Sequence, residues 1–438
     1  MVQSKYDFPN ITFKEMNTFL QKLSLLFSDK SLRRRVLFVF FTLIIFRILA
    51  AIPVPGVSVG SLSTFLSTNQ FLGLLNIFSG GGLANLSIVM LGVGPYITAT
   101  IIMQLLTMVF PRLKEIYHEE GEAGRKKFSQ YSRLISVPLA FLQGYGLLAL
   151  LTSQQILEPL SPFHKLVTII VITAGSLLLM WIGELINEFG IGNGTSIIIF
   201  SGIVAGLPRS ISQAIFTFEI SQLPLYIGFV AVAVLIVAGV VLVTEAERPI
   251  PVTYAKRVRG GKMYGGMSTY LPLRLNQAGV IPIIFALSIL LFPQMITNLL
   301  STSSNSIIQS VTGFINSVLQ NQWVYGILYF ILVFIFTYFY TAITFDPHAT
   351  SENLQKSGAF IPGTRPGAST TEHLSQIVTR LTTFGALFLG IIAVLPIIMQ
   401  GATGISTLAI GGTGLLIVVS VVIDLVKQIN AQLSIREY

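Results

Sequence analysis

The chain has 438 residues, of which 53% are hydrophobic and only 10% are charged. Soluble domains carry about 25% charged residues, so this composition excludes an ordinary soluble protein and favours an integral membrane protein. The absence of cysteine excludes disulfides, thiolate metal sites and cysteine nucleophiles. A net charge of +9 fits either a nucleic-acid-binding protein or a membrane protein oriented by its basic loops, and the positions of the charges distinguish the two.

The chain begins with the polar segment MVQSKYDFPNITFKEM, which lacks the apolar core and the small-residue cleavage site of a signal peptide. We therefore expect the first spanning helix to direct insertion. A helix that crosses a hydrocarbon core of about 30 Å needs about 20 apolar residues. Windows of this length predict spanning helices at 36–52, 86–110, 130–151, 164–186, 195–216, 224–244, 276–299, 323–344, 375–397 and 407–429.

These windows predict an all-α integral membrane protein with ten transmembrane helices, and the even number places both termini on one side of the membrane. We divide the chain into an N-terminal segment (1–35), an N-terminal half with helices one to five (36–220), a C-terminal half with helices six to ten (221–429) and a tail (430–438). The C-terminal half contains two long polar loops, at 245–275 and 345–374.

The basic residues fall almost entirely on one side of this topology. All of the 27 Lys and Arg residues except Arg47, Lys165 and Arg209 lie in or beside the N-terminal segment, the tail, or the connections that follow the second, sixth and eighth helices. Basic loops stay in the cytoplasm, so both termini are predicted to be cytoplasmic. Membrane orientation therefore accounts for the charge without a nucleic-acid ligand.

The predicted helices carry few ionisable residues. Arg47 lies close to the outer end of the first helix, from which it can reach the interface, and Glu184, Glu188 and Asp424 lie near cytoplasmic ends. The chain has no HExxH or GxxxxGK[ST] motif. We therefore expect no enzyme, no cofactor and no metal site. The alternative to a passive conduit is an inverted-repeat secondary transporter for a small solute, although transporters place Asp, Glu, Lys or His inside their helices.

Two short patterns recur in the two halves. The pattern G-V-x-P-x-I occurs at 92–97 and 279–284, and the pattern G-T-x-h-h-I, where h is aliphatic, occurs at 194–199 and 412–417. A five-plus-five duplication would pair these helices, and an odd number of spans per half gives the copies opposite orientations. Inverted repeats place a functional site where the halves meet. Chance recurrence of common membrane residues is the other explanation.

Prolines and glycines mark further breaks. Pro95 and Pro282 fall inside the second and seventh predicted helices, where each removes a backbone donor and favours a kink. Residues 71–79 form an apolar segment that is too short to span the membrane and is followed by three glycines at 80–82. We predict a re-entrant segment that occupies a cavity rather than facing lipid.

Several long runs of the sequence resemble one family of membrane proteins. They are NIFSGG (76–81), LGVGPYI (91–97), MWIGELINEFGIGNGTSIIIFSGIVAGLP (180–208), ERPIPVTYAKR (247–257), STYLPLRLNQAGVIPIIFA (268–286) and SGAFIPGTRPG (357–367). These runs span both halves and follow the family's order. In them the chain resembles the bacterial type of the SecY/Sec61-alpha family, the channel-forming subunits of the protein-export translocon.

The resemblance implies two inverted five-helix halves around a central hourglass pore, which opens sideways to lipid between the second and seventh helices. It implies a protein-conducting channel that moves unfolded secretory polypeptides across the membrane, binds signal sequences and releases apolar segments through this lateral gate, with Pro95 and Pro282 at its hinges. The implied membrane is the cell inner membrane. The implied partners are the SecE and SecG subunits, the SecA ATPase, the ribosome, the preprotein with its signal sequence, and membrane lipid.

The resemblance also assigns individual residues. The pore ring falls on Val93, Ile97, Thr195, Ile199, Ile284 and Ile417, which would form a dry constriction. Thr195 either faces this constriction or turns its hydroxyl to its own backbone. The plug of the outer funnel falls on 71–79, where Leu74, Leu75 and Phe78 would pack beneath the ring.

The two polar loops resemble the docking loops of the family. Lys256, Arg257, Arg259 and Lys262 lie in the first loop, and Arg365 lies in the second. Family members often carry a basic pair directly after the loop glycine, whereas this chain has only Lys262 after Gly261. Clustered basic side chains suit an acidic motor surface or ribosomal RNA phosphates, and a role in orientation alone is the alternative.

Overall fold

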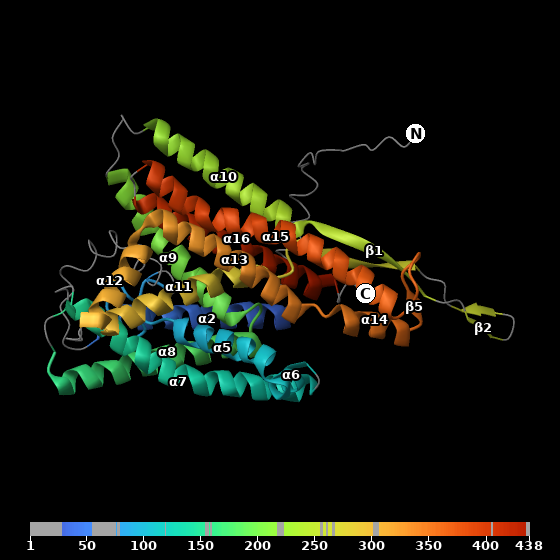
Figure 1. Ribbon diagram of the computed structural model, residues 1–438, viewed down its shortest axis with the longest axis horizontal. Helices are drawn as coiled ribbons and strands as arrows, with labels where there is room; N and C mark the ends of the chain where they lie inside the picture. Colours follow the sequence, from blue (N-terminus) through green and yellow to red (C-terminus); the bar gives the residue numbers. More distant parts are fainter. Residues whose placement is uncertain are drawn as a thin grey trace.

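A computed structural model describes residues 29–54, 76, 79–118, 120–153, 157, 160–216, 223–254, 257–259, 262–264, 268–300, 306–403 and 406–434. These residues are mostly helical (Figure 1). The helices are α2 (Lys30–Ala51), α5 (Gly94–Val109), α6 (Pro111–His118), α7 (Gly121–Ser153), α8 (Pro162–Phe189), α9 (Gly194–Phe216), α10 (Leu223–Glu245), α11 (Ile281–Leu300), α12 (Ser306–Gln320), α13 (Gln322–Thr344), α14 (Pro347–Lys356), α15 (Ala368–Thr403) and α16 (Ser406–Ser434).

A helix overlaps each predicted spanning range. In the described part of the chain, six helices are long and apolar enough to cross a membrane, namely α7, α8, α10, α13, α15 and α16. The pair α5 and α6, bent by 117°, makes a seventh candidate. The apolar stretches of α9 and α11 are shorter, at Gly194–Pro208 and Ile281–Leu290. The architecture is that of a multi-pass membrane protein.

Two of the predicted helices begin later than expected, and this changes the role of their prolines. Because α5 begins at Gly94 and α11 at Ile281, Pro95 and Pro282 lie in the first turn of their helices. The first N–H groups of a helix have no intrahelical partner, so proline loses no hydrogen bond there. The predicted kinks at these two residues are therefore wrong. Prolines inside helices are found instead at Pro138, Pro208, Pro293 and Pro396.

The all-α prediction is also wrong in the two polar loops, which contain β-strands. The strands are β1 (Glu247–Tyr254), β2 (Arg257–Arg259), β3 (Lys262–Tyr264), β4 (Ser268–Arg274) and β5 (Ala359–Phe360). β1 pairs antiparallel with β4 from Glu247, opposite Arg274, to Thr253, opposite Ser268. Its other edge pairs with β5 only at Thr253 and Tyr254. β2 and β3 form a separate two-stranded hairpin.

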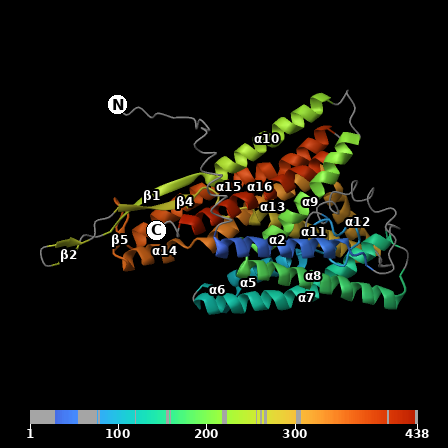
Figure 2. The same cartoon turned by 180° about the vertical axis from the view of Figure 1, so that it is seen from behind.

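The helices form two groups that lie on opposite sides of the molecule. Figures 1 and 2 show α5, α7 and α8 together on one side and α10, α13, α15 and α16 on the other. The groups meet where α11 packs against α5 and α7, and where α16 packs against α9. The strands and α14 extend from one end of the helices, and α12 lies at the opposite end (Figure 1).

Candidate functional site

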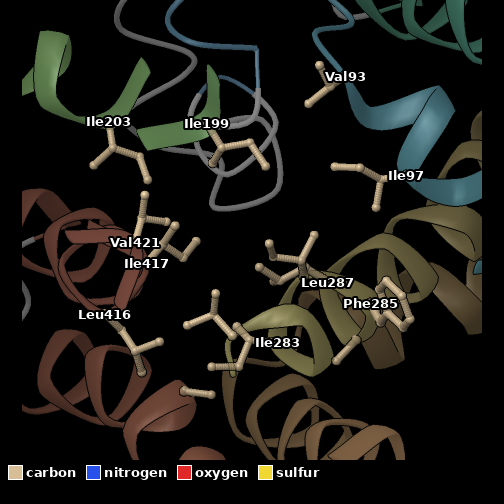
Figure 3. Close-up of a cluster of buried hydrophobic side chains, with 14 of the residues drawn as sticks. Val93, Ile97, Ile199, Ile203, Ile283, Phe285, Leu287, Leu416, Ile417 and Val421 are labelled. Atoms are coloured by element: carbon tan, nitrogen blue, oxygen red, sulfur yellow. The ribbon is translucent and has the colours of Figure 1, made fainter. Parts of the chain in front are cut away.

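Most of the predicted ring residues lie in one buried apolar cluster, at the place where the two groups of helices meet. We call them the waist residues: Val93, Ile97, Ile199, Ile284 and Ile417. None of them is more than 8% exposed. Figure 3 shows the side chains of Ile97, Ile199 and Ile417 turned toward one another from three different helices. Aliphatic side chains packed in this way exclude water.

The two copies of the G-V-x-P motif have the same backbone structure. Gly92 and Gly279 both have a positive φ, of 59° and 62°. A helix begins two residues after each glycine, at Gly94 and at Ile281. The isoleucine that ends each motif therefore lies in the first turns of its helix, as Ile97 in α5 and Ile284 in α11. The two copies of the G-T-x-h-h-I pattern do not share a backbone structure. The first copy begins helix α9 at Gly194, whereas Gly412 of the second copy lies within α16.

Thr195, the polar residue of the predicted ring, uses its hydroxyl in a local hydrogen bond at the start of α9. Its hydroxyl donates a hydrogen bond to Asn193 Oδ1 over 2.6 Å, and the same oxygen accepts from the backbone N–H groups of Thr195 and Ser196. Asn193 therefore caps α9. The methyl group of Thr195 lies 3.5 Å from the position that a Cβ on Gly183 of α8 would take. The side chain thus serves the start of α9 and its contact with α8.

The buried cluster contains further residues that the sequence did not single out. Figure 3 shows Ile203, Leu287 and Val421 beside the waist residues. Helical spacing was the signal that could have identified them, because each follows a waist residue of the same helix by three or four positions.

The residues assigned to the plug fall largely outside the described part of the chain, and this includes Leu74, Leu75 and Phe78. Within 71–79 the structure describes Asn76 and Ser79. Gly80 and Gly81 follow with positive φ values of 67° and 82°, as expected at a glycine-induced break.

The turn after this segment is fixed to its surroundings by several contacts. Arg47 Nη1 of α2 donates a hydrogen bond to the carbonyl oxygen of Gly80 over 2.7 Å. Asn76 Oδ1 accepts from the N–H of Ala84, and Ser79 Oγ accepts from the N–H of Leu83. These hydrogen bonds give partners to backbone N–H and C=O groups that lie outside helices and strands, so they hold the turn at residues 79–84 in place.

The two predicted docking loops form one structural unit. A small apolar cluster joins the face of the β4–β1–β5 sheet to the start of α15, and its members are Ile250, Val252, Leu273, Ala359, Ile361, Leu374, Ile377 and Val378. Arg365 is exposed on this unit, where its carbonyl oxygen accepts a hydrogen bond from the buried Thr370 hydroxyl over 2.8 Å. The second loop is therefore held against the first.

The basic residues of the first loop lie toward the end of the long hairpin. Arg259 pairs with Lys262 across the turn of the β2–β3 hairpin, and Arg257 pairs with Tyr264. Lys256 lies outside the described residues. In Figure 1 this hairpin lies beyond the end of β1, at the greatest distance from the helices.

Comparisons with known proteins agree with this architecture. The sequence model of the SecY family matches residues 87–426. The protein translocase subunits SecY of Mycobacterium bovis and Thermus thermophilus are each 43% identical to the chain, over 93% of it and 96% and 94% of their own lengths. That of Synechocystis is 40% identical over 96% of each chain.

Solved structures share the fold at low sequence identity. A protein-conducting channel matches with a TM-score of 0.63 and 19% identity, covering 98% of this chain and 95% of that chain. Sec61 in the canine ribosome–channel complex matches with a TM-score of 0.59 and 18% identity, over the same shares. The fold, the order of the motifs and the match to the family over most of the sequence lead to one conclusion: the chain belongs to the SecY family of protein translocase subunits.

Proposed function

We propose that this protein is a channel through which unfolded secretory polypeptides cross the membrane and from which apolar segments leave sideways into lipid. The observation that carries the proposal is the convergence of aliphatic waist residues from α5, α9, α11 and α16, where the two groups of helices meet. The relatives named as protein translocase subunits support it. Nothing in the site favours the alternative of a solute transporter.

The physical task explains the need for such a path. An unfolded chain drawn through lipid would leave its backbone amides without partners, at several kcal/mol for each group. A water-filled funnel on each side of a short dry waist removes most of this cost. The aliphatic side chains close around each other at rest, and a moving chain pushes them apart.

The lateral exit lies between α5 and α11, which pack against each other. An apolar segment gains free energy by leaving the aqueous path for lipid at this seam, so the channel sorts segments by hydrophobicity and binds signal sequences there. Pro95 and Pro282 start these two helices with a fixed φ, and we assign the gate movement to the glycine turns that precede them.

The membrane topology is part of the proposal. Ten spanning helices form two inverted halves, 36–220 and 221–429, around an hourglass pore. The channel lies in the cell inner membrane, and residues 1–35 and 430–438 lie in the cytoplasm. A helix in each predicted range and the shared backbone of the G-V-x-P motifs support this topology. Residues 71–79, with Leu74, Leu75 and Phe78, form the plug.

The driving force comes from partners, since the sequence contains no nucleotide-binding motif. SecA or the ribosome binds the unit formed by the two docking loops, where Arg365, Arg257, Arg259, Lys262 and Lys256 provide the positive charge. One neighbouring structure is a ribosome–channel complex of Sec61, which supports a ribosome as one partner. SecE and SecG complete the membrane part of the complex.

Site-specific crosslinking tests the channel function directly. The chain has no cysteine, so Ile97→Cys introduces the only thiol of this subunit. We expect this thiol to crosslink to a stalled secretory chain in proteoliposomes with SecE, SecG, SecA and ATP, and only when ATP is present. Ile227→Cys on α10, which is 62% exposed and faces away from the waist, is the matched control. Active translocation without a crosslink from residue 97 would refute the waist as the path.

A further inference from the structure

A cavity of about 210 Å³ lies next to the waist, on the side of the β-strands. It is enclosed by the start of α9, the ends of α10 and α13, the segment between β4 and α11, and one face of α16. Its wall toward the waist is apolar, with Ile197, Val280 and Val421. Its polar wall includes Arg274, Asn276, Gln277 and Asp424. At about 30 Å³ for each water molecule, the cavity has room for the end of a side chain.

Asn276 presents an unpaired acceptor to this cavity. The residue is only 7% exposed. Its Nδ2 donates a hydrogen bond to the carbonyl oxygen of Gly279 over 3.2 Å, and this bond fixes the orientation of the amide. Its Oδ1 is buried and has no hydrogen-bond partner among the residues that the structure describes. A buried acceptor without a partner is costly, so such a group indicates a ligand that donates.

The adjacent side chain repeats this pattern. The Oε1 atom of Gln277 is also buried and accepts no hydrogen bond from the described residues. Both amides belong to the short segment that links β4 to α11, so the same local structure presents two acceptors.

The third acceptor is the carboxylate of Asp424 on α16. Within the described ranges it accepts no hydrogen bond and has no ion pair. The charges of Arg274 and Lys427 act on it, but both groups are engaged elsewhere. Arg274 Nε lies 3.4 Å from Glu247 Oε1, and Lys427 Nζ donates to the carbonyl oxygen of Thr244 over 3.1 Å. The cavity therefore combines two neutral acceptors with the exposed carboxylate of Asp424, and the guanidinium of Arg274 in its lining is paired with Glu247.

We propose that this cavity binds the ammonium or guanidinium group of a lysine or arginine side chain of the polypeptide in the channel, an inference that rests on the proposed function. A cation with several N–H donors matches the two amide oxygens and the carboxylate, and hydrogen bonds between charged partners are the strongest of this kind. Asp424 follows Val421 by three residues and Ile417 by seven, so it lies on the same face of α16 as the waist. The bound side chain is held directly before the waist and delays the passage of the segment that carries it.

The test uses a secretory polypeptide that a folded C-terminal domain stops in the channel, in membranes that contain the complete complex. One residue of the polypeptide is varied between Lys, Gln and Glu at each of a series of positions, and the half-life of the arrested chain is measured after the driving force is removed. With the wild-type channel we expect the Lys chain to persist about tenfold longer than the Gln chain at one position, since a charge-assisted hydrogen bond has about this effect. The Glu chain should leave fastest.

Variants of the channel assign this order to the cavity. Asp424→Asn should make the three half-lives equal, whereas Asp424→Glu should restore the order. Glu188→Gln, which removes an exposed carboxylate of α8 outside the cavity and outside the docking loops, should leave the order unchanged. If the order of the three half-lives is the same in the wild type and in Asp424→Asn, the carboxylate only balances the positive charges of Arg274 and Lys427. The proposal is then wrong. Equal half-lives of the three chains in the wild-type channel also refute the cation site, but they leave the channel function standing. A wild-type channel that admits none of the chains refutes the channel function itself.

Discussion

Among single residues, two glycines set the spacing between the turn at residues 79–84 and α9. Gly80 packs directly against Gly202, so a Cβ added to Gly202 would lie 2.2 Å from Gly80 Cα. A Cβ added to Gly80 would lie 2.2 Å from Cζ of Phe46. Gly202 is three residues after Ile199, so this contact also fixes one waist residue.

Gly202→Ala should therefore open the resting channel. The added methyl group has no space, and relief of the overlap moves α9 at a cost of about 1–3 kcal/mol. We expect a higher ion conductance of proteoliposomes without substrate and a lower melting temperature in detergent. Gly206→Ala, one turn further along α9, is the matched control, since a Cβ there meets nothing within 4 Å. Equal conductance of the two variants would contradict the proposed link.

The waist residues themselves allow a second prediction. Changing both Ile97 and Ile284 to Asn should admit water to the waist and raise resting conductance by about tenfold for each 1.4 kcal/mol by which the barrier falls. It should also weaken the discrimination between functional and defective signal sequences. The double Leu variant keeps the apolar surface and serves as the control. A double Asn variant with wild-type conductance would remove these residues from the barrier.

At the scale of single residues, the sequence predicted which isoleucines gather in the buried cluster, but it left the environment of Thr195 open. Ile97 and Ile284 end a motif whose glycine and proline start a helix in both halves, so their equivalence was visible in the chain. Thr195 occupies a matching place in a motif, but the preceding Asn193 takes its hydroxyl for a helix cap. A local hydrogen bond of this kind competes with any role in the pore and leaves no trace in hydropathy.

Among the elements, the docking strands were missed because of their prolines. Pro249, Pro251 and Pro272 lie within β1 and β4, and proline is depleted in strands because it cannot donate to the ladder. The structure accommodates Pro249 and Pro251 because the second edge of β1 is paired with β5 only further along, at Thr253 and Tyr254. The signal in the sequence that favoured a strand was the spacing of Ile250 and Val252, two residues apart. Both of these side chains are buried in the structure.

The sheet makes a prediction about the second docking loop. Ile361 is 2% exposed in the apolar cluster below the sheet, so Ile361→Ala should create a cavity that costs about 2–5 kcal/mol locally. We expect faster cleavage by trypsin after the exposed Lys356, which directly precedes this loop segment, and weaker binding of SecA. Phe360→Ala is the control, because the neighbouring Phe360 is 37% exposed. Similar cleavage rates in both variants would show that the cluster does not hold the loop.

For the whole molecule, hydropathy predicted where helices occur but not how they are arranged. Twenty apolar residues in a row are sufficient evidence for a span, so a helix is present in every predicted range. The starts of α5 and α11 were placed too early because the apolar residues 86–93 and the uncharged segment 276–280 are not helical. The packing of α11 against α5, which places the waist, depends on contacts between distant segments that a single sequence does not show.

The orientation of the molecule can be measured with single cysteines. Arg365 lies at the end that carries the strands, and Phe163 begins α8 in a loop predicted to lie outside, where it is 71% exposed. A membrane-impermeant thiol reagent added to intact cells should label Phe163→Cys and leave Arg365→Cys unlabelled, because basic loops stay in the cytoplasm. Inside-out vesicles should give the reverse pattern, and the cysteine-free wild type sets the background. Labelling of both positions from one side would contradict the topology.

The paired strands β1 and β4 also act as a lever. They have 8 and 7 residues, so at about 3.3 Å per residue the arm is about 23–26 Å long. Its base is closed by the hydrogen bond from Leu275 N–H to the Ala246 carbonyl oxygen, and from there the chain runs directly into α11. A force on the far end of the arm therefore exerts a torque on the start of α11. The start of α11 moves less than the far end does, but with greater force. An arm shortened by two residue pairs would keep its buried face and lose about 7 Å of reach, so the same opening would demand a greater force from whatever pushes it.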